Sequence, residues 1–486
     1  MRPVFLLTDI FVFTLVAACL LYAWRVFQNP HLRATWSLAW RRPVAAVSGL
    51  MLGLFIVIAL MDSLHYRPVM PAQDGTGQSY GSEPRSILDA VLKPLAQARE
   101  RSYSAPLASH GFRKETFERD GQSVRDYPRL SFGGAHLKDP SAEWLADVAG
   151  RSLRALVLGS GLFVLVMLLG LQYAAYRQRQ PFRQCLDRLV RGDTTWPWRS
   201  LAVTLGVLVL LITWMVQLSE VYHIFGTDRT GNSVLMIALK SIRTALVIGS
   251  LTTLVVLPMA LLLGVTAGYF RGWVDEMIQY LYTLLASIPD VLLIAATVLM
   301  LQVFIDKNAG LFDTILERSD ARLFFLCLIL GVTSFTGLCR LIRGETLKLR
   351  ELEYIQAAQA FGVSTPRILF AHITPNLMHL VMINCVMQFS SFILAEAVLS
   401  YVGVGVDPNT ASFGVMINTA RAELAATPVI WWTLLTAFLF MFLLVLSANL
   451  LADAIRDAFD PKARLRLRVK SKRQPAPKSP LPEGAV

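Results

Sequence analysis

The 486-residue sequence consists of long apolar blocks separated by short polar stretches. A membrane-spanning helix needs about 20 mostly apolar residues. Backbone groups inside lipid are satisfied only in helices or closed barrels, and these blocks lack the alternating pattern of barrel strands. We therefore predict an all-α fold, a polytopic transmembrane helical bundle. Its expected spans lie near residues 4–24, 44–61, 153–176, 200–219, 242–270, 277–305, 323–342, 377–402 and 429–452.

The composition fits this interpretation. Charged residues make up 16% of the chain and apolar residues 54%, whereas soluble proteins carry about 25% charged residues. This balance disfavours a soluble enzyme and excludes a disordered chain. The five cysteines form no C-x-x-C pair and the seven histidines lie far apart. Neither a disulfide framework nor a metal site is therefore predicted.

Basic residues are concentrated in three stretches, 25–43, 177–199 and 461–486. Together they carry a net charge of +15, more than the +12 of the whole chain. Lys and Arg accumulate in cytoplasmic loops, and all three stretches fall on one side if nine spans are drawn. We expect the N-terminus outside, an uncleaved first helix and a cytoplasmic C-terminus. Orientation and contact with membrane lipid explain the charge, so no nucleic-acid partner is predicted.

The stretch 63–150 is the one long polar insert, with 11 basic and 11 acidic residues. We expect an extracytoplasmic insert, within which residues 86–101 have helical spacing and a kink at Pro94. Contact with a binding protein or partner subunit and passive packing are equally open roles for it. The predicted organisation is two N-terminal spans (1–62), the insert (63–150), an extra span with a basic loop (151–199), a core (200–461) and a disordered tail (462–486).

Motifs for catalysis are missing from the sequence. It has no G-x-x-x-x-G-K-[ST] phosphate loop, no H-E-x-x-H and no G-x-S-x-G. We therefore predict that the chain is not an enzyme. Acids inside spans would mark an ion path, but only Asp9, Asp290 and Glu396 qualify. Contacts between helices are the favoured role for these acids, and a place in the pathway is the alternative for Asp290 and Glu396.

A cytoplasmic loop at 343–375 carries the clearest local signal. Residues 351–361 favour a helix that ends at Gly362, where glycine can adopt positive φ. Ser364 or Thr365 can cap a second helix with Pro366 at its first position. Pro375 is expected to end that helix before the next span. The result is a short helix–turn–helix on the inner face of the membrane.

This loop resembles the EAA loop of permease subunits in binding-protein-dependent ABC importers. The family pattern is E-A-A-x-x-x-G, followed about ten residues later by Pro. Here Gln356-Ala357-Ala358, Gly362 and Pro375 stand at those positions. Gln356 replaces the usual acid, and Glu353 can substitute for it in part.

The flanking residues resemble the dipeptide/oligopeptide branch, specifically its second (C-type) permease subunit. The signature H-x-[FL]-G-T-D-x-x-G-R-D-V-L is matched by residues 223–235, which keep Gly226, Thr227, Asp228 and Gly231. Asn232 and Ser233 stand where Arg and Asp are usual. Further similar segments are 267–278, 287–293, 394–406, 411–417 and 448–461. The resemblance covers about 200–461, with six spans, and leaves the enlarged N-terminus outside it.

This resemblance implies a bacterial inner-membrane permease that forms half of a translocation pathway for peptides. The implied partners are a second permease subunit, two ATPase subunits (or a fused pair) and an extracytoplasmic binding protein. The segment Gln356–Gly362 would be the coupling helix. No cofactor is expected in this chain, since the partners hydrolyse ATP.

Three alternatives remain at this point. The same machine could carry a nickel chelate, an antimicrobial peptide or an opine. A secondary transporter would need inverted repeats with broken helices in both halves, and no matching pair is found. A membrane assembly factor that has kept the fold is the third.

Overall fold

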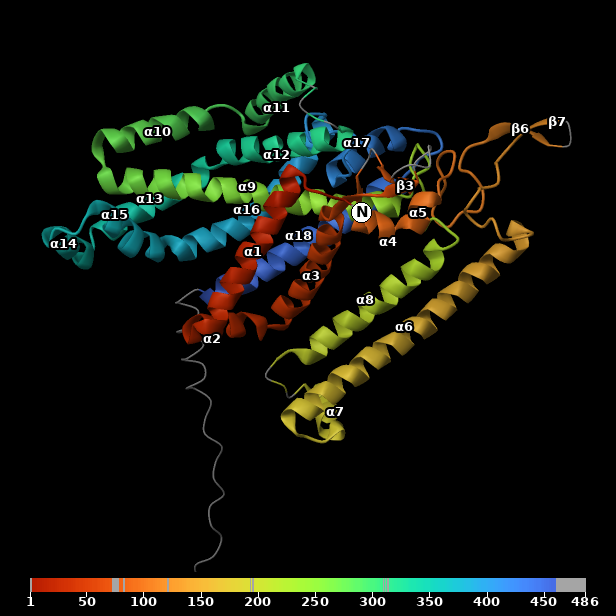
Figure 1. The fold of residues 1–486 in the computed structure, drawn as a ribbon, viewed down its shortest axis with the longest axis horizontal. Coiled ribbons are helices and arrows are strands. Elements are labelled where there is room, and N and C mark those ends of the chain that lie inside the picture. Colours follow the sequence, from red (N-terminus) through yellow and green to blue (C-terminus); the bar gives the residue numbers. More distant parts are fainter. Residues whose placement is uncertain are drawn as a thin grey trace, which may run out of the picture.

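The computed structural model describes residues 2–71, 78–81, 84–119, 122–192, 194, 196–308, 310, 312 and 314–459. The tail predicted to be disordered, 462–486, lies outside the described residues. The fold is helical throughout the membrane part, which confirms the predicted all-α polytopic bundle (Figure 1).

The N-terminal part contributes six of the larger helices: α1 (Leu7–Gln28), α2 (Pro30–Trp40), α3 (Pro43–Ser63), α6 (Pro140–Gln178), α7 (Phe182–Arg191) and α8 (Trp198–Ser219). Proline opens three of them, at the position where a missing N–H does not matter. The α6 helix begins well before the expected residue 153. The cause is Asp139, whose side chain accepts a hydrogen bond from the Ser141 amide and caps the helix.

The remaining helices build the core, and α9 runs through its centre. In chain order they are α9 (Val234–Phe270), α10 (Gly272–Ala286), α11 (Asp290–Lys307), α12 (Ile315–Ser334), α13 (Thr336–Arg350), α14 (Glu353–Ala360), α15 (Thr365–Ile368), the π-helical turn η2 (Leu369–Ile373), α16 (Thr374–Val402), α17 (Phe413–Leu424) and α18 (Trp432–Phe459). Helices α10, α12, α13, α16, α17 and α18 all pack against α9 or against its direct neighbours.

Seven described helices are long and apolar enough to cross a membrane, or up to nine spans if each bent pair counts as one. Two predicted spans, 277–305 and 323–342, are wrong as continuous helices. The stretch 277–305 consists of α10 and α11, which are bent by 85° at the break before Asp290. The residue before a proline is disfavoured in helical geometry, and Pro289 therefore separates the two helices. The pair α12 and α13 is bent by 42°.

The insert holds small sheets and two short helices. Its elements are β2 (His65–Arg67), β3 (Val69–Pro71), β4 (Gln78–Tyr80), β5 (Arg85–Ser86), α4 (Ile87–Val91), α5 (Lys93–Gln97), β6 (Glu115–Arg119) and β7 (Gln122–Asp126). The N-terminal strand β1 (Arg2–Val4) pairs with β2, so the start of the chain lies beside the insert. The predicted helical stretch is present, and Pro94 stands near the start of α5, after the break at Leu92.

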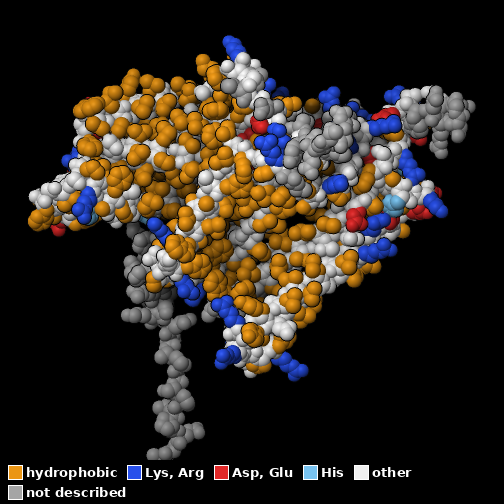
Figure 2. Space-filling view, in the orientation of Figure 1, with side chains coloured by type: hydrophobic (Ala, Val, Ile, Leu, Met, Phe, Trp, Pro, Cys, Tyr) orange, Lys and Arg blue, Asp and Glu red, His pale blue; other side chains and the backbone are white. Residues whose placement is uncertain are grey.

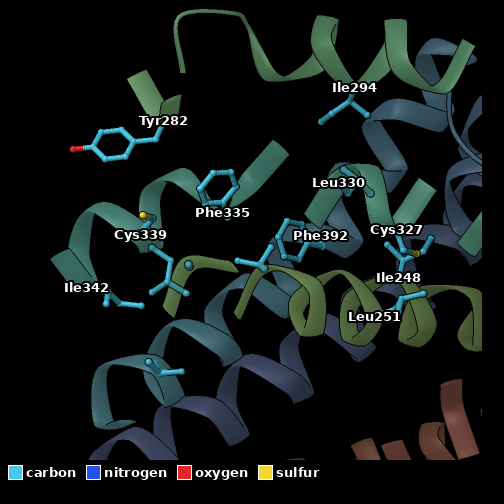
Figure 3. Close-up of a cluster of buried hydrophobic side chains, with 14 of the residues drawn as sticks. Ile248, Leu251, Tyr282, Ile294, Cys327, Leu330, Phe335, Cys339, Ile342 and Phe392 are labelled. Carbon is cyan, nitrogen blue, oxygen red and sulfur yellow. The ribbon is translucent and has the colours of Figure 1, made fainter. Parts of the chain in front are cut away.

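The main buried cluster connects α9 to α10, α11, α12, α13 and α16 (Figure 3). It includes Ile248 and Leu251 of α9, Leu330 of α12, Ile342 of α13 and Phe392 of α16. Apolar side chains also cover much of the visible outer face over α10, α12 and the α6–α8 pair (Figure 2). In a membrane protein such a surface faces lipid or another subunit.

Candidate functional site

The predicted helix–turn–helix forms the end of the molecule opposite β6 and β7 (Figure 1). Its first helix, α14, begins at Glu353, two residues later than expected, and ends at Ala360. Gly362 has φ of +75°, and the amides of Gly362 and Val363 donate to the carbonyl oxygens of Gln359 and Ala358. These bonds close the helix in the manner of a glycine C-cap.

The coupling segment, defined here as residues 353–375, is anchored in the core from its inner side. Ile355, Ile368 and Ile373 are fully buried in the main cluster. Gln359 donates from Nε2 to the Tyr269 hydroxyl of α9 at 3.2 Å. These contacts make the segment a stiff extension of the transmembrane core.

The outer side of the segment is open. Gln356, Ala357, Gly362 and Pro375 are exposed, and Phe361 is 87% exposed. The small side chain of Ala357 leaves the α14 surface accessible to another polypeptide. Gln356 donates from Nε2 to the carbonyl oxygen of Glu351. Glu353 is exposed in the first turn of α14, within reach of the same surface.

The second half of the segment differs from the prediction. Pro366 stands at the second helical position, after Thr365, and the Ser364 side chain makes no capping hydrogen bond. Pro375 does not end the helix: Thr365–Val402 is one continuous apolar helix. The reason is the π-helical turn η2, in which the Thr374 amide donates to the Leu369 carbonyl oxygen. Such a wider turn accommodates a proline ring within a helix.

Behind the segment, α9 and α13 approach closely. Cβ atoms added at Gly264 and Gly268 would lie 2.8 Å from the Cys339 and Arg343 carbonyl oxygens. Arg343 of α13 also pairs with Asp275 of α10 in a bidentate ion pair, with N–O distances of 2.5 and 2.7 Å. Neither feature is predicted from the sequence above. The G-x-x-x-G spacing at 264–268 is a known signal for close helix packing, but no pattern signals the ion pair.

The signature loop, residues 223–235, precedes α9 at the other end of the molecule. Gly226 and Gly231 have φ of +70° and +78°, which glycine adopts without strain. Asp228 Oδ1 accepts from the amides of Thr230 and Asn232 and thereby holds the turn. All four predicted signature residues thus lie in one tight loop.

The insert packs directly on this loop, at a surface that we call the junction (residues 99–112 against 223–235). Thr227 is fully buried: its amide donates to the Ser104 carbonyl oxygen at 3.1 Å, and its hydroxyl accepts from the Ser104 amide at 2.6 Å. The Glu100 amide donates to the Gly231 carbonyl oxygen. Trp432 of α18 donates from Nε1 to the Thr227 carbonyl oxygen at 3.0 Å. The junction therefore joins the insert, the signature loop and α18.

A buried carboxylate stabilises the insert side of the junction. Glu100 accepts hydrogen bonds from the amides of Ser131, Phe132 and Gly133 and from the Ser131 hydroxyl. Burial by itself would raise the pKa of Glu100. The His223 imidazole, 3.8 Å away, and the bonds from Ser131 and Gly133 outweigh burial and hold this pKa well below its ordinary value.

Glu396 and Asp290 have different surroundings. Glu396 is buried and accepts hydrogen bonds from Ser400 at 2.7 Å and Ser412 at 3.0 Å, so it connects α16 with the N-terminus of α17. Asp290 is exposed at the first position of α11. The contact between helices predicted for Asp290, and the alternative place in the pathway, stay predictions.

The third intramembrane acid, Asp9, belongs to a buried ion cluster. Arg243 of α9 lies 2.7 Å from Asp9 of α1 and 3.5 Å from Asp320 of α12. His65 contacts the second Asp9 oxygen at 2.8 Å, and Thr8 donates from its hydroxyl and amide to Asp320. The cluster fastens the N-terminal helix to the core.

The fold, the coupling segment and the junction define a polytopic membrane protein with a rigid, exposed surface at one end. Among the described residues, no group of three or more His, Cys, Asp or Glu could hold a metal ion. Comparison with known families agrees with this class. The model for the binding-protein-dependent transport system inner membrane component matches residues 260–465, which include the coupling segment.

Curated relatives match about half of the chain. The oligopeptide transport system permease protein OppC of Mycobacterium tuberculosis is 31% identical over 242 residues, covering 50% of this chain and 77% of the relative. The glutathione transport system permease protein GsiD of Pectobacterium atrosepticum is 31% identical over 242 residues, 50% of this chain and 73% of that protein. The dipeptide transport system permease protein DppC of Bacillus subtilis is 30% identical, with coverages of 50% and 69%. This chain belongs to the family of binding-protein-dependent transport system inner membrane components.

Proposed function

We propose that this chain is the permease subunit of an ABC importer for peptides and that it forms half of the translocation pathway beside a second permease subunit. The observation that carries the proposal is the exposed coupling segment, rigidly anchored in a core whose relatives are named as permeases for oligopeptides, dipeptides and glutathione. Those names favour peptides over the other cargoes considered.

In this proposal ATP is hydrolysed outside the chain, by two ATPase subunits or a fused pair, and the chain itself is not an enzyme. The ATPase would bind the exposed face that carries Gln356 and Ala357, with the half-buried Ala358 packed beneath it against the core. Because Ile355, Ile368 and Ile373 fix the segment to the core, a push on α14 would move α13, α9 and α16 as a unit. ATP drives transport only if it favours one arrangement of these helices over another.

The orientation follows from the same arrangement. The coupling segment lies at the end of the molecule opposite β6 and β7 of the insert (Figure 1). An ATPase is cytoplasmic, so the insert and strand β1 would be extracytoplasmic, where a binding protein delivers substrate. The excess of basic residues in 25–43 and 177–199 supports this orientation.

The test is to replace Gly362 with Asp and, separately, Ala358 with Trp. A side chain at Gly362 meets no atom within 4 Å, but φ of +75° disfavours non-glycine residues. Ala358 is half-buried against the main cluster, so Trp must displace α14. We expect uptake of a labelled peptide to fall at least tenfold and co-expressed ATPase subunits to co-purify poorly, while the permease still inserts.

Gly192→Asp is the matched control. Gly192 has φ of +79°, also meets no atom within 4 Å, and follows α7, away from the coupling segment. This variant should transport normally. Normal uptake by both coupling-segment variants would refute the assignment of the coupling helix.

A further inference from the structure

A cavity of about 210 Å³ lies where the insert meets the start of α9. Helix α5 and the residues after it supply one side, including Leu95 and Arg99. The signature loop and the first turns of α9 supply the other, including Asn232, Ser233, Met236 and Lys240. The cavity therefore exists only because the insert is docked on the core.

One residue that lines the cavity, Ser233, has a buried hydroxyl without a hydrogen-bond partner among the described residues. Ser233 is 2% exposed. It occupies the N-cap position of α9, yet its side chain does not cap the helix. A buried hydroxyl without a partner is destabilising unless a further group satisfies it.

The charges around the cavity favour an anion. One wall of the cavity is the side of the first two turns of α9, close to the N-terminus of this 37-residue helix, which carries partial positive charge. Lys240 lies 2.7 Å from Asp89, so its charge is largely balanced. Arg99 is exposed, donates from Nε to the Thr230 carbonyl oxygen, and makes no ion pair within the described residues.

The nearby acids are already engaged elsewhere. Asp228 accepts hydrogen bonds from Thr230 and Asn232 within the signature loop, and Glu100 accepts those from residues 131–133. Position 233 itself carries Ser where the resembling signature has Asp. A carboxylate at that position would repel an anion from the cavity, and its absence leaves the positive charge available.

We propose that this cavity binds the carboxylate of a small organic molecule, held by the Ser233 hydroxyl and Arg99 beside the N-terminus of α9. The apolar lining from Leu95 and Met236 leaves room for a short apolar group beside the carboxylate. Both a free organic acid and the C-terminus of a short peptide have this chemistry. The inference rests on the docked insert and holds whatever cargo the permease carries.

The test is a binding titration of the purified full-length protein in lipid nanodiscs, with propionate and L-alanyl-L-alanine as probes. The matched probes are propionamide and the C-terminal amide of the dipeptide. We expect saturable binding of at least one acid, and at least tenfold weaker binding of its amide. Tighter binding of the dipeptide would identify a peptide terminus as the source, and equal binding of both acids would identify small organic acids in general.

Two variants connect that binding to the cavity. Arg99→Gln removes the exposed cation, and Ser233→Asp introduces the repelling carboxylate, so each should weaken binding of the acid at least tenfold. Lys114→Gln is the control: Lys114 is an exposed base of the insert, over the Tyr127 ring and outside the cavity. It should bind like the natural protein.

If Ser233→Asp disturbs folding, a comparison of Arg99→Gln with Arg99→Lys decides the question. Both variants lose the hydrogen bond from Arg99 Nε to the Thr230 carbonyl oxygen across the junction, and only Arg99→Gln loses the positive charge. The proposal is overturned if neither acid binds saturably, if acid and amide bind equally, or if Arg99→Gln binds like Lys114→Gln. Since the assay measures binding without transport, failure of the proposed import function would not affect its result.

Discussion

Gly231 shows how one residue can decide whether the insert stays docked. A Cβ at this position would lie 1.9 Å from the Glu100 carbonyl oxygen, and φ of +78° already disfavours any side chain. We expect Gly231→Ala to displace the insert from the signature loop. Limited proteolysis should then cleave the insert at least tenfold faster than in the natural protein, because residues 99–112 lose their contacts.

Gly403→Ala is the control for Gly231→Ala, because it introduces backbone strain without a steric clash. Gly403 has φ of +89° at the end of α16, with no atom within 4 Å of an added Cβ. It should cost only the strain of a left-handed residue, about 1–2 kcal/mol, and leave the protease sensitivity of the insert unchanged. Equal sensitivity of the two variants would mean that the junction tolerates a shift at Gly231.

Glu100 makes the junction sensitive to acid. Its pKa in the folded protein lies below the ordinary value of 4.5. The stabilisation is therefore complete above about pH 4.5 and is lost as pH falls below that value. We expect the protease sensitivity of the insert to stay constant from neutral pH to about pH 4.5 and to rise below that pH by at most about tenfold per pH unit. The assay uses an acid-active protease and a neutral one at matched activity, down to pH 3.5.

The Glu100→Gln variant distinguishes this carboxylate from other acidic groups. An amide cannot titrate, and as a neutral acceptor it binds the three amides of residues 131–133 less strongly. The variant should be looser at neutral pH and should change less on acidification. A pH response identical to that of the natural protein would assign the effect to a different residue.

At the residue scale, sequence reasoning identified the signature residues but not their partners. Gly226 and Gly231 were singled out through the family resemblance and do adopt positive φ. The contacts of Thr227 with Ser104 span 123 residues of chain. No periodicity or spacing signals such a long-range contact, so the junction could only be seen in the structure.

At the scale of elements, the Arg243 cluster holds α1, α9 and α12 together. Arg243 is 8% exposed and contacts carboxylates from two other helices. Removing one member of a buried ion cluster leaves uncompensated charge, at a cost of about 3–5 kcal/mol. We expect Arg243→Met to lower the thermal unfolding temperature markedly in detergent, as measured by intrinsic tryptophan fluorescence.

Arg318→Met provides the comparison. Arg318 stands on α12 and pairs with Asp306, and their side chains are 39% and 46% exposed, far more than that of Arg243. Exposed pairs contribute about 0–1 kcal/mol, so this variant should unfold close to the natural temperature.

A double variant, Asp9→Asn with Arg243→Met, should lose less stability than the sum of the losses in the two single variants. Strict additivity would show that the contact carries no coupling energy.

Helices were easier to predict than their ends and bends. Apolar blocks located the spans because lipid leaves the backbone few alternatives. Prolines were harder to interpret: Pro289 does separate two helices, whereas Pro375 lies inside a continuous one. The difference is the π-helical turn at 369–373, whose wider geometry has no apolar pattern of its own. Helix α2 was not predicted either. It has only 11 residues, of which four are basic or polar, and a segment of that length and composition is hard to distinguish from a loop.

At the scale of the molecule, residues before the family core are built into it. Helix α3 packs against α9 and α18, α1 packs against α12, and the insert covers the signature loop. The sequence resemblance begins near residue 200 and leaves the enlarged N-terminus outside it. The packing indicates that the first 192 residues and the core fold as one unit.

This view predicts the behaviour of a chain cut between α7 and α8. When residues 1–193 and 194–486 are expressed as two polypeptides in one cell, we expect a tag on the first to recover the second in near-equal amounts. The apolar faces of α3, α6 and α8, the Arg243 cluster and the junction all cross the cut, and their contacts do not depend on a covalent connection.

The contacts that cross the cut can be weakened separately from the apolar packing. Gly231→Ala and Arg243→Met together in the second polypeptide remove the junction and the ion cluster, and recovery should fall at least tenfold. Gly403→Ala in the same polypeptide touches neither and should leave recovery unchanged. If the natural halves separate although both insert into the membrane, the N-terminal region is an independent module. If the double variant still pairs fully, apolar packing between the membrane helices is sufficient to hold the two polypeptides together. The polar contacts would then serve to set the position of the insert.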